Sequence, residues 1–230
     1  QVCRVQGRQD QVRSPFQTRQ PKPRQLERGF FLLGAPVAGD FTQKGLPMSE
    51  ILIRPVFPAD HAAISDLMRA AYARHMSGSY PETLVRAALP HLTRPVPSLL
   101  FGGRYVLAEA GDEVLGIAGW SDISPFGRTC PPGQAHLRHM AIAPEWQRQR
   151  LGRALMGHLL AMANLTGVQQ MHCLCPLNAV PFCKATGFDT LGEVFLSLSP
   201  DVSLPAAQMR LELGGLPDLY PKAFVAGAAL

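Results

Sequence analysis

The chain has 230 residues, of which 47% are hydrophobic, and this composition is sufficient for a packed core. No apolar run reaches the roughly 18 residues that a membrane span needs, which argues against a membrane protein. Residues 1–47 hold eight basic and three acidic residues and account for the whole net charge of +5, since the remainder holds fourteen of each. The folded part is therefore neutral overall, which argues against nucleic acid as its partner.

Residues 1–47 are rich in Gln and Arg, are broken by Pro and Gly, and show no sustained periodicity. We expect them to be a disordered extension or sequence upstream of the natural start, because the segment from Met48 to Pro55 resembles the start of a protein. A transit peptide is the alternative, since the segment is rich in Arg and poor in acids, but it holds little Ser. The expected organisation is a domain over residues 48–213, followed by a tail over residues 214–230.

From Met48 onward, hydrophobic periodicity predicts regular elements. A first strand ends at Pro55, and a helix follows that Asp60 can cap. A second helix is expected over residues 81–89, and a hairpin over residues 104–120. A loop rich in Pro and Gly follows. The remaining expected elements are a strand at 136–144, a helix that stops near Gly167, a strand at 168–175, a short helix within 176–188, and strands at 194–199 and 207–213.

The strand–helix–strand unit over residues 136–175 implies a parallel pair of strands with a right-handed crossover. The other neighbouring strands are joined by short connections, which indicates antiparallel pairing. The predicted fold class is therefore α/β, with a mixed sheet and helices on both faces.

The stretch WQRQRLGRAL, Trp146 to Leu155, leads from a strand through a basic, Gly-containing loop into a helix. The first N–H groups of a helix have no partner within it, and the peptide dipoles add partial positive charge there. Such a helix start is typical of a binding site for phosphate. A phosphate-bearing cofactor is therefore predicted.

The five cysteines do not indicate a disulfide framework, because their number is odd. Cys173 and Cys175 lie two apart in a strand and face the same side. Without Cys or His partners at ligand spacing they do not predict a metal site, so no metal is expected. Buried free thiols in a reducing compartment, the cytoplasm, are the preferred interpretation.

Three segments in this order resemble the GNAT superfamily of N-acetyltransferases: LRHMAIAP, ending at Pro144; QRQRLG, starting at Gln147; and NAVPFCKATGF, from Asn178 to Phe188. The resemblance covers about residues 51–213. It implies a mixed, twisted sheet of six to seven strands, in which the fourth and fifth strands are parallel and splay apart to admit acetyl-CoA.

The resemblance also implies which residues bind acetyl-CoA. Backbone groups of Met140 and Ile142 would pair with the pantetheine arm and the acetyl carbonyl, and Asn178 would lie beside that arm. The residues that would surround the pyrophosphate are Gln147, Arg148, Gln149, Arg150, Leu151, Gly152 and Arg153.

Two positions depart from the family pattern. Arg150 stands where the first Gly of the loop motif is usual, and its backbone fits if φ is negative, in which case its guanidinium could reach a phosphate. The alternative is an exposed side chain that points away. Cys183 stands where the family often has a Tyr that acts as general acid to the departing thiolate. The alternative is that Cys183 is a small buried hydrophobe and that water is the acid.

The implied reaction is direct transfer of an acetyl group from acetyl-CoA to a primary amine, which must be neutral to attack. Candidate bases are Glu109 and His139. Strand alternation predicts that His139 faces the opposite side to the four residues His136, Arg138, Met140 and Ile142.

The acceptor is expected to be a small-molecule or peptide amine, not nucleic acid or a membrane, and such domains often form homodimers. The alternative function is a sensor module that binds coenzyme A without turnover. A nucleic-acid-binding protein that uses the basic N-terminus is a third hypothesis.

Overall fold

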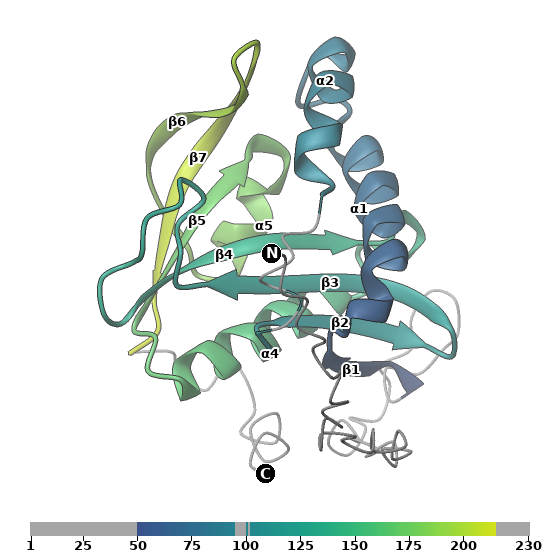
Figure 1. Cartoon of the computed structure of the whole chain (residues 1–230), viewed down its shortest axis with the longest axis vertical. Coiled ribbons are helices and arrows are strands. Elements are labelled where there is room, and N and C mark those ends of the chain that lie inside the picture. The colour runs from purple at the N-terminus through teal and green to yellow at the C-terminus, as the bar shows by residue number, and fades with distance from the viewer. Residues whose placement is uncertain (1–49, 95–99, 101, 215–230) are drawn as a thin grey trace, which may run out of the picture. The chain divides into compact units, whose positions relative to one another are not determined.

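The computed structural model describes residues 50–94, 100 and 102–214, and these belong to one structural unit (Figure 1). The extension predicted over residues 1–47 lies outside the described residues, as does the predicted tail apart from Gly214. None of the helices in the described ranges combines the length and apolar character needed to cross a bilayer.

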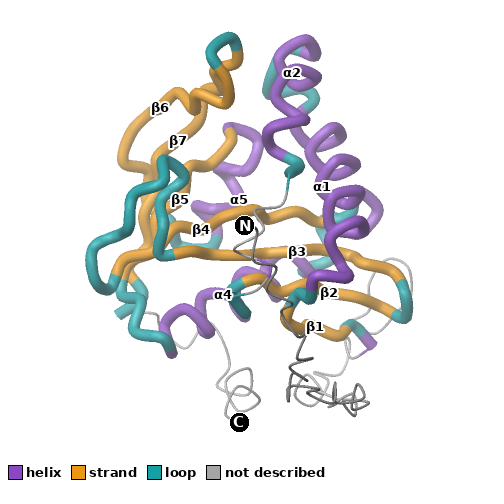
Figure 2. Tube along the Cα trace, in the orientation of Figure 1, coloured by secondary structure: helices purple, strands orange, loops and turns teal. Residues whose placement is uncertain are grey.

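The elements follow the order predicted from the sequence, with strands and helices as in Figure 2. The strands are β1 (Leu52–Pro55), β2 (Tyr105–Ala110), β3 (Glu113–Ser121), β4 (Gln134–Ile142), β5 (Gln170–Pro176), β6 (Asp189–Ser199) and β7 (Val202–Glu212). The α-helices are α1 (His61–Met76), α2 (Glu82–Leu92), α4 (Leu151–Leu165) and α5 (Val180–Ala185), and short 3-10 turns are η2 (Pro58–Asp60), η3 (Pro144–Trp146) and η4 (Leu177–Ala179).

The seven strands form one mixed sheet in the order β1-β2-β3-β4-β5-β7-β6. Only β4 and β5 are parallel, and α4 supplies the crossover between them. Their pairing stops after three residue pairs, the last of which is His136 with His172. Beyond that pair β4 continues to Ile142 without a partner in β5, so the two strands diverge. The α/β mixed sheet and the splayed parallel pair predicted from the sequence are both confirmed.

Helices cover both faces of this sheet: α1 and α2 lie on one face, and α4 and α5 lie on the other (Figure 1). Two glycines of β3 point to these two faces. A Cβ added to Gly116 would meet Leu155 of α4, and a Cβ added to Gly119 would meet the ring of Tyr105 on the opposite face. Trp120 and Trp146 are buried in the core. The burial of α4 against the sheet fixes where its N-terminus lies, next to the end of β4.

Three local predictions need correction. Asp60 does not cap α1, because its carboxylate binds Arg54 and the N–H of Phe57 instead. Helix α2 does not end at Leu89 but includes Pro90, which removes a single N–H donor close to the helix end. Strand β6 begins at Asp189, five residues earlier than predicted, because pairing with β7 stabilises residues that lack a hydrophobic pattern.

Candidate active site

The gap between β4 and β5 exposes main-chain groups of β4. The N–H of Ala143 donates to Leu115 of β3 at 2.8 Å. Because alternate residues of a strand bond to opposite neighbours, the main-chain groups of Met140 and Ile142 point away from β3 and into the gap. These are the two residues that the sequence predicted to bind the pantetheine arm.

A β-bulge interrupts β4 just before these residues. Between the pairs Trp120–Leu137 and Ala118–Met140, β4 has two residues, Arg138 and His139, where β3 has one. Bulges bend a strand and re-aim its side chains. The bulge therefore marks the point at which β4 turns away from β5.

The bulge overturns part of the predicted alternation along β4, although His139 does face the opposite side to Ile142, as predicted. Ile142 faces α4, since a Cβ on Gly116 would meet its Cδ1 at 2.7 Å. His139 faces the other side, where its Nδ1 is hydrogen-bonded to the hydroxyl of Tyr105. One extra residue reverses the side that all later residues face, so His136 and Ile142 do not share a face as predicted.

Two side chains of α1 contact the carbonyl groups that face the gap. The hydroxyl of Tyr72 donates to the Met140 oxygen at 3.4 Å, and Nε2 of His75 donates to the Ile142 oxygen at 3.1 Å. The Nδ1 of His75 then accepts from Nε2 of Gln147 at 2.6 Å, so the imidazole links the loop to the strand. Neither Tyr72 nor His75 is among the site residues predicted from the sequence, although their spacing of three puts both on one helix face.

The loop before α4 has an unusual backbone. Arg148 and Arg150 adopt φ values of 59° and 64°, in the left-handed region. The negative φ under which the guanidinium of Arg150 could reach a phosphate is therefore not adopted: Arg150 takes the conformation for which the family pattern uses Gly. This backbone turns the chain so that α4 starts at Leu151, with the side chains of Arg148, Arg150 and Arg153 exposed around its N-terminus.

The left-handed backbone at residue 150 gives a prediction that is independent of the side chain. Arg150→Gly is expected to be about 1 kcal/mol more stable than Arg150→Ala, because only Gly adopts this region without a steric cost. Both variants lack the guanidinium and all its contacts, so their difference reports the backbone alone. Urea denaturation of the pair measures it, and equal stabilities would contradict a left-handed residue 150.

The other predicted cofactor residues lie around the same helix start. Gln149 is buried, and its amide nitrogen donates to the Glu145 oxygen at 2.7 Å, which fixes the loop rather than exposing the side chain. A Cβ on Gly152 would lie 3.5 Å from Phe182, which is an ordinary contact, so packing does not require Gly there. Asn178 follows β5 in η4, and its Oδ1 is buried and has no hydrogen-bond partner within the described residues.

The structure does not bring Glu109 to the gap. Glu109 is the last residue but one of β2 and pairs with Leu52 of β1, on the other side of β3 from β4. Arg54 binds both its oxygens, at 3.0 and 2.9 Å, and also binds Asp60. The hydrogen bond from Arg54 lowers the pKa of Asp60. Arg54, Asp60 and Glu109 therefore form a structural ion-pair network.

His139 does lie beside the gap, but its surroundings make it a weak base. Burial, assisted by the charge of Arg138, lowers the pKa of His139 to about 4. The imidazole is therefore neutral at pH 7. Its neighbour His136 is similar: burial and the nearby His172 lower the pKa of His136 to about 4, and the two rings lie 5.4 Å apart at the root of the gap.

The buried His139 should make the fold sensitive to mild acid. The unfolded chain takes up a proton below a pH of about 6.5, whereas the folded imidazole resists protonation until a pH of about 4. Stability is complete above pH 6.5 and falls as the pH is lowered, by about 1–2 kcal/mol for His139 between pH 7 and pH 5. Urea denaturation should show a smaller loss over this range for His139→Gln, and an identical loss would contradict the buried neutral state.

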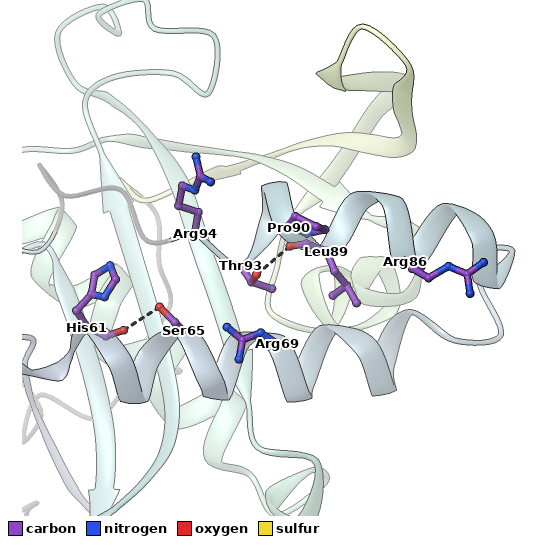
Figure 3. A pocket seen from close by; sticks show the side chains of 8 residues that line it. All are labelled: His61, Ser65, Arg69, Arg86, Leu89, Pro90, Thr93 and Arg94. Carbon is purple, nitrogen blue, oxygen red and sulfur yellow. Dashed lines mark hydrogen bonds between the residues drawn. The ribbon is translucent and has the colours of Figure 1, made fainter.

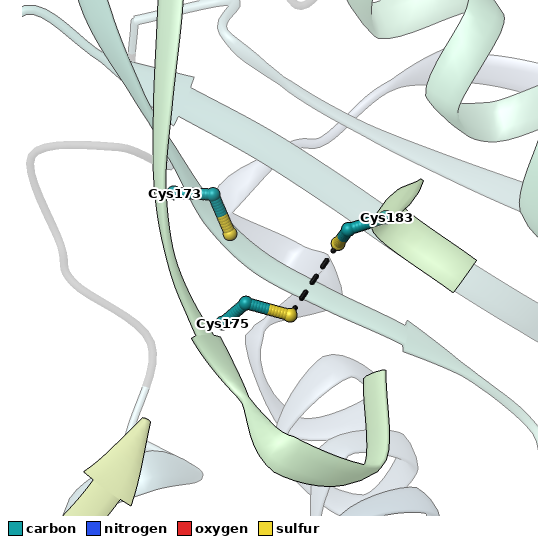
Figure 4. Close-up of side chains that lie close together, drawn as sticks. All are labelled: Cys173, Cys175 and Cys183. Carbon is teal, nitrogen blue, oxygen red and sulfur yellow. Dashed lines mark hydrogen bonds between the residues drawn. The ribbon is translucent and has the colours of Figure 1, made fainter. Parts of the chain in front are cut away.

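Cys183 lies on α5 and is buried against β5. The thiol of Cys175 donates to the Cys183 sulfur at 3.4 Å, and Cys173 lies beside them (Figure 4). The predicted common face of Cys173 and Cys175 is confirmed by their alternating burial along β5. No sequence pattern indicated that the fold would bring Cys183 to the two strand cysteines.

An open cavity of about 410 Å³ lies elsewhere, between α1 and α2 (Figure 3). Its lining includes Arg69, Arg86 and Arg94, and no residue of β4, β5 or α4. It is therefore separate from the gap and from the helix start.

A sheet opened between two parallel strands, with a helix N-terminus beside the opening, is the arrangement that the resemblance to acetyl-CoA-dependent acyltransferases implied. The family model described as "Acetyltransferase (GNAT) family" matches residues 64–188, more than half of the chain. The chain therefore belongs to the GNAT family of acetyltransferases, as the three sequence segments had indicated.

Solved structures show the same fold. The paiA N-acetyltransferase of Thermoplasma acidophilum, in complex with coenzyme A, has a TM-score of 0.55 and 14% identity, covering 70% of this chain and 98% of that one. A GCN5-related N-acetyltransferase of Rhodopseudomonas palustris has a TM-score of 0.56 and 17% identity, covering 70% of this chain and 94% of that one. No curated protein matches the chain in sequence.

Proposed function

We propose that this protein transfers an acetyl group from acetyl-CoA directly to a primary amine. The amine nitrogen attacks the thioester carbonyl, the carbon–sulfur bond breaks, and an amide and the free thiol of coenzyme A are formed. The observation that carries the proposal is the gap in the sheet, because there the main-chain groups of Met140 and Ile142 face away from β3 without a partner in β5, beside the N-terminus of α4.

The N-terminus of α4 and the free edge of β4 suit two different parts of acetyl-CoA. The helix N-terminus, with Arg148, Arg150 and Arg153 around it, suits the pyrophosphate. The N–H groups of β4 would hold the pantetheine arm and the oxyanion that forms at the carbonyl. Holding the thioester and the amine together supplies much of the rate enhancement.

No side chain is assigned as the base. His139 is a weak base because its pKa is about 4, and Glu109 is bound by Arg54 away from the gap. We propose that water takes the amine proton. The departing thiolate has a pKa near 8.5, like other thiols, so it can leave without an acid from the protein. Cys183, which lies in contact with Cys175, then takes no part in the transfer.

The test is a panel of amines, including amino acids, polyamines, aminoglycosides and peptides, incubated with acetyl-CoA and the full chain while free thiol is measured. Thiol release that depends on the amine is expected. With water as the acceptor of the proton, kcat/KM should rise with pH until the pKa of the amine itself is reached. Binding of acetyl-CoA without thiol release for any amine would favour the sensor module instead.

The acceptor class and compartment belong to the same proposal. The acceptor is a small-molecule or peptide amine that enters from the α1 face. The described cysteines are free, which supports a reducing compartment such as the cytoplasm.

A further inference from the structure

We propose that Cys173, Cys175 and Cys183 form a binding site for one thiophilic divalent cation, Zn²⁺. The three Sγ atoms lie within 4.8 Å of one another, and those of Cys175 and Cys183 are 3.4 Å apart. Figure 4 shows the three side chains pointing toward a common centre from β5 and α5. The site is distinct from the helix start and needs no acetyl-CoA.

The distances suit a shared cation. A zinc–sulfur bond is about 2.3 Å long, so tetrahedral angles place ligand sulfurs about 3.8 Å apart. The Sγ atoms of Cys175 and Cys183 are slightly closer than this, at 3.4 Å, and all three lie within 4.8 Å of one another, so side-chain rotations would bring them to it. Two ligands come from alternate residues of one strand and the third from the helix after it, so all three have fixed backbones.

The burial of the three cysteines and their sulfur ligands favour a soft cation. All three cysteines are buried, with 6%, 1% and 3% of their surface exposed for Cys173, Cys175 and Cys183. The cluster offers only sulfur, which hard cations such as Mg²⁺ and Ca²⁺ bind poorly. Three thiolates around Zn²⁺ leave one negative charge, whereas three around Cu⁺ would leave two, which is costlier in a buried site.

Binding is coupled to loss of protons. Zinc binds cysteine as the thiolate, so each of the three thiols must give up its proton. Binding then replaces three S–H protons by one cation, and the protons pass to solvent: three thiols and Zn²⁺ give a trithiolate complex and three H⁺. The affinity should therefore rise steeply with pH. A trithiolate site leaves the fourth zinc position for water or another small ligand.

The experiment uses the full chain, kept reduced with a phosphine, and Zn²⁺ as the probe. Native mass spectrometry should show one Zn²⁺ per chain, with Mg²⁺ not bound. The matched control is Cys130→Ser, which removes a half-buried cysteine outside the cluster and should keep full stoichiometry. Cys183→Ser should weaken binding at least tenfold. Unchanged affinity in Cys183→Ser would overturn the proposal.

Alkylation mapping keeps the test valid if Cys183→Ser fails to fold. In the wild-type chain, Zn²⁺ should protect Cys173, Cys175 and Cys183 from a small alkylating reagent after mild loosening with urea, and should leave Cys130 unprotected. Equal alkylation with and without Zn²⁺ would overturn the proposal. Since neither measurement involves acetyl-CoA or an amine, its failure is distinguishable from failure of the proposed acetyl transfer.

Discussion

Gly119→Ala is expected to lower the free energy of unfolding by about 3 kcal/mol. A Cβ at this position of β3 would lie 2.1 Å from Cε2 and 2.2 Å from Cδ2 of Tyr105, so the ring must move. The ring is buried, and its hydroxyl accepts the His139 N–H at 3.4 Å and bonds to the His139 imidazole. Overpacking costs about 1–3 kcal/mol, and loss of a buried hydrogen bond adds about 1 kcal/mol.

Urea denaturation of the variant measures this loss, and Gly192→Ala in β6 is the matched control. Nothing lies within 4 Å of a Cβ at Gly192, so this variant should be as stable as the wild type or slightly more stable. In a double-mutant cycle, Tyr105→Leu should relieve part of the cost of Gly119→Ala, because it removes ring atoms that clash. A loss below about 1 kcal/mol for Gly119→Ala would contradict the close packing of Tyr105 on β3.

The order of elements could be predicted from the sequence because each has its own hydrophobic period. Ile64, Leu67 and Met68 mark one buried face of α1, and the alternation of Met171, Cys173 and Cys175 marks β5. The parallel pairing of β4 and β5 followed from the length of the crossover between them. These are local signals, and they need no knowledge of how distant segments meet.

The parts of the site that could not be predicted all depend on contacts between distant segments. The bulge at Arg138 and His139 is set by pairing with β3 and the Tyr105 contact, and no local pattern distinguishes it from regular alternation. The contact of His75 with the Ile142 carbonyl joins residues 67 positions apart. Cys183 lies at no recognised ligand spacing from Cys173 and meets it only because α5 folds back on β5.

The loop before α4 shows a different limit of prediction from sequence, which concerns the backbone conformation of a single residue. The motif QRQRLG identified the coenzyme loop, but the substitution of Arg for Gly left two backbone conformations open for residue 150. The left-handed one is retained at a cost of about 1–2 kcal/mol, because the chain must turn sharply between η3 and α4. The geometry of the loop therefore outweighs the preference of the residue.

Arg153→Glu is expected to weaken binding of acetyl-CoA by about ten- to a hundredfold while leaving the fold intact. Arg153 is exposed and is the third residue of α4, beside the N-terminus where we place the pyrophosphate. A carboxylate there repels phosphate but interacts favourably with the helix dipole, by about 0.3–1 kcal/mol. Affinity and stability should therefore change in opposite directions, which general misfolding would not produce.

Calorimetry with acetyl-CoA and urea denaturation measure the two effects, and Arg86→Glu is the matched control. Arg86 is equally exposed and its reversal makes the same change in net charge, but it lies on α2 in the separate cavity (Figure 3). It should leave the affinity within about threefold, since the cavity that it lines includes no residue of β4, β5 or α4 and salt at 0.1 M screens exposed charges. If Arg153→Glu and Arg86→Glu lowered the affinity for acetyl-CoA equally, the loss would come from long-range charge alone. The N-terminus of α4 would then not be the phosphate site.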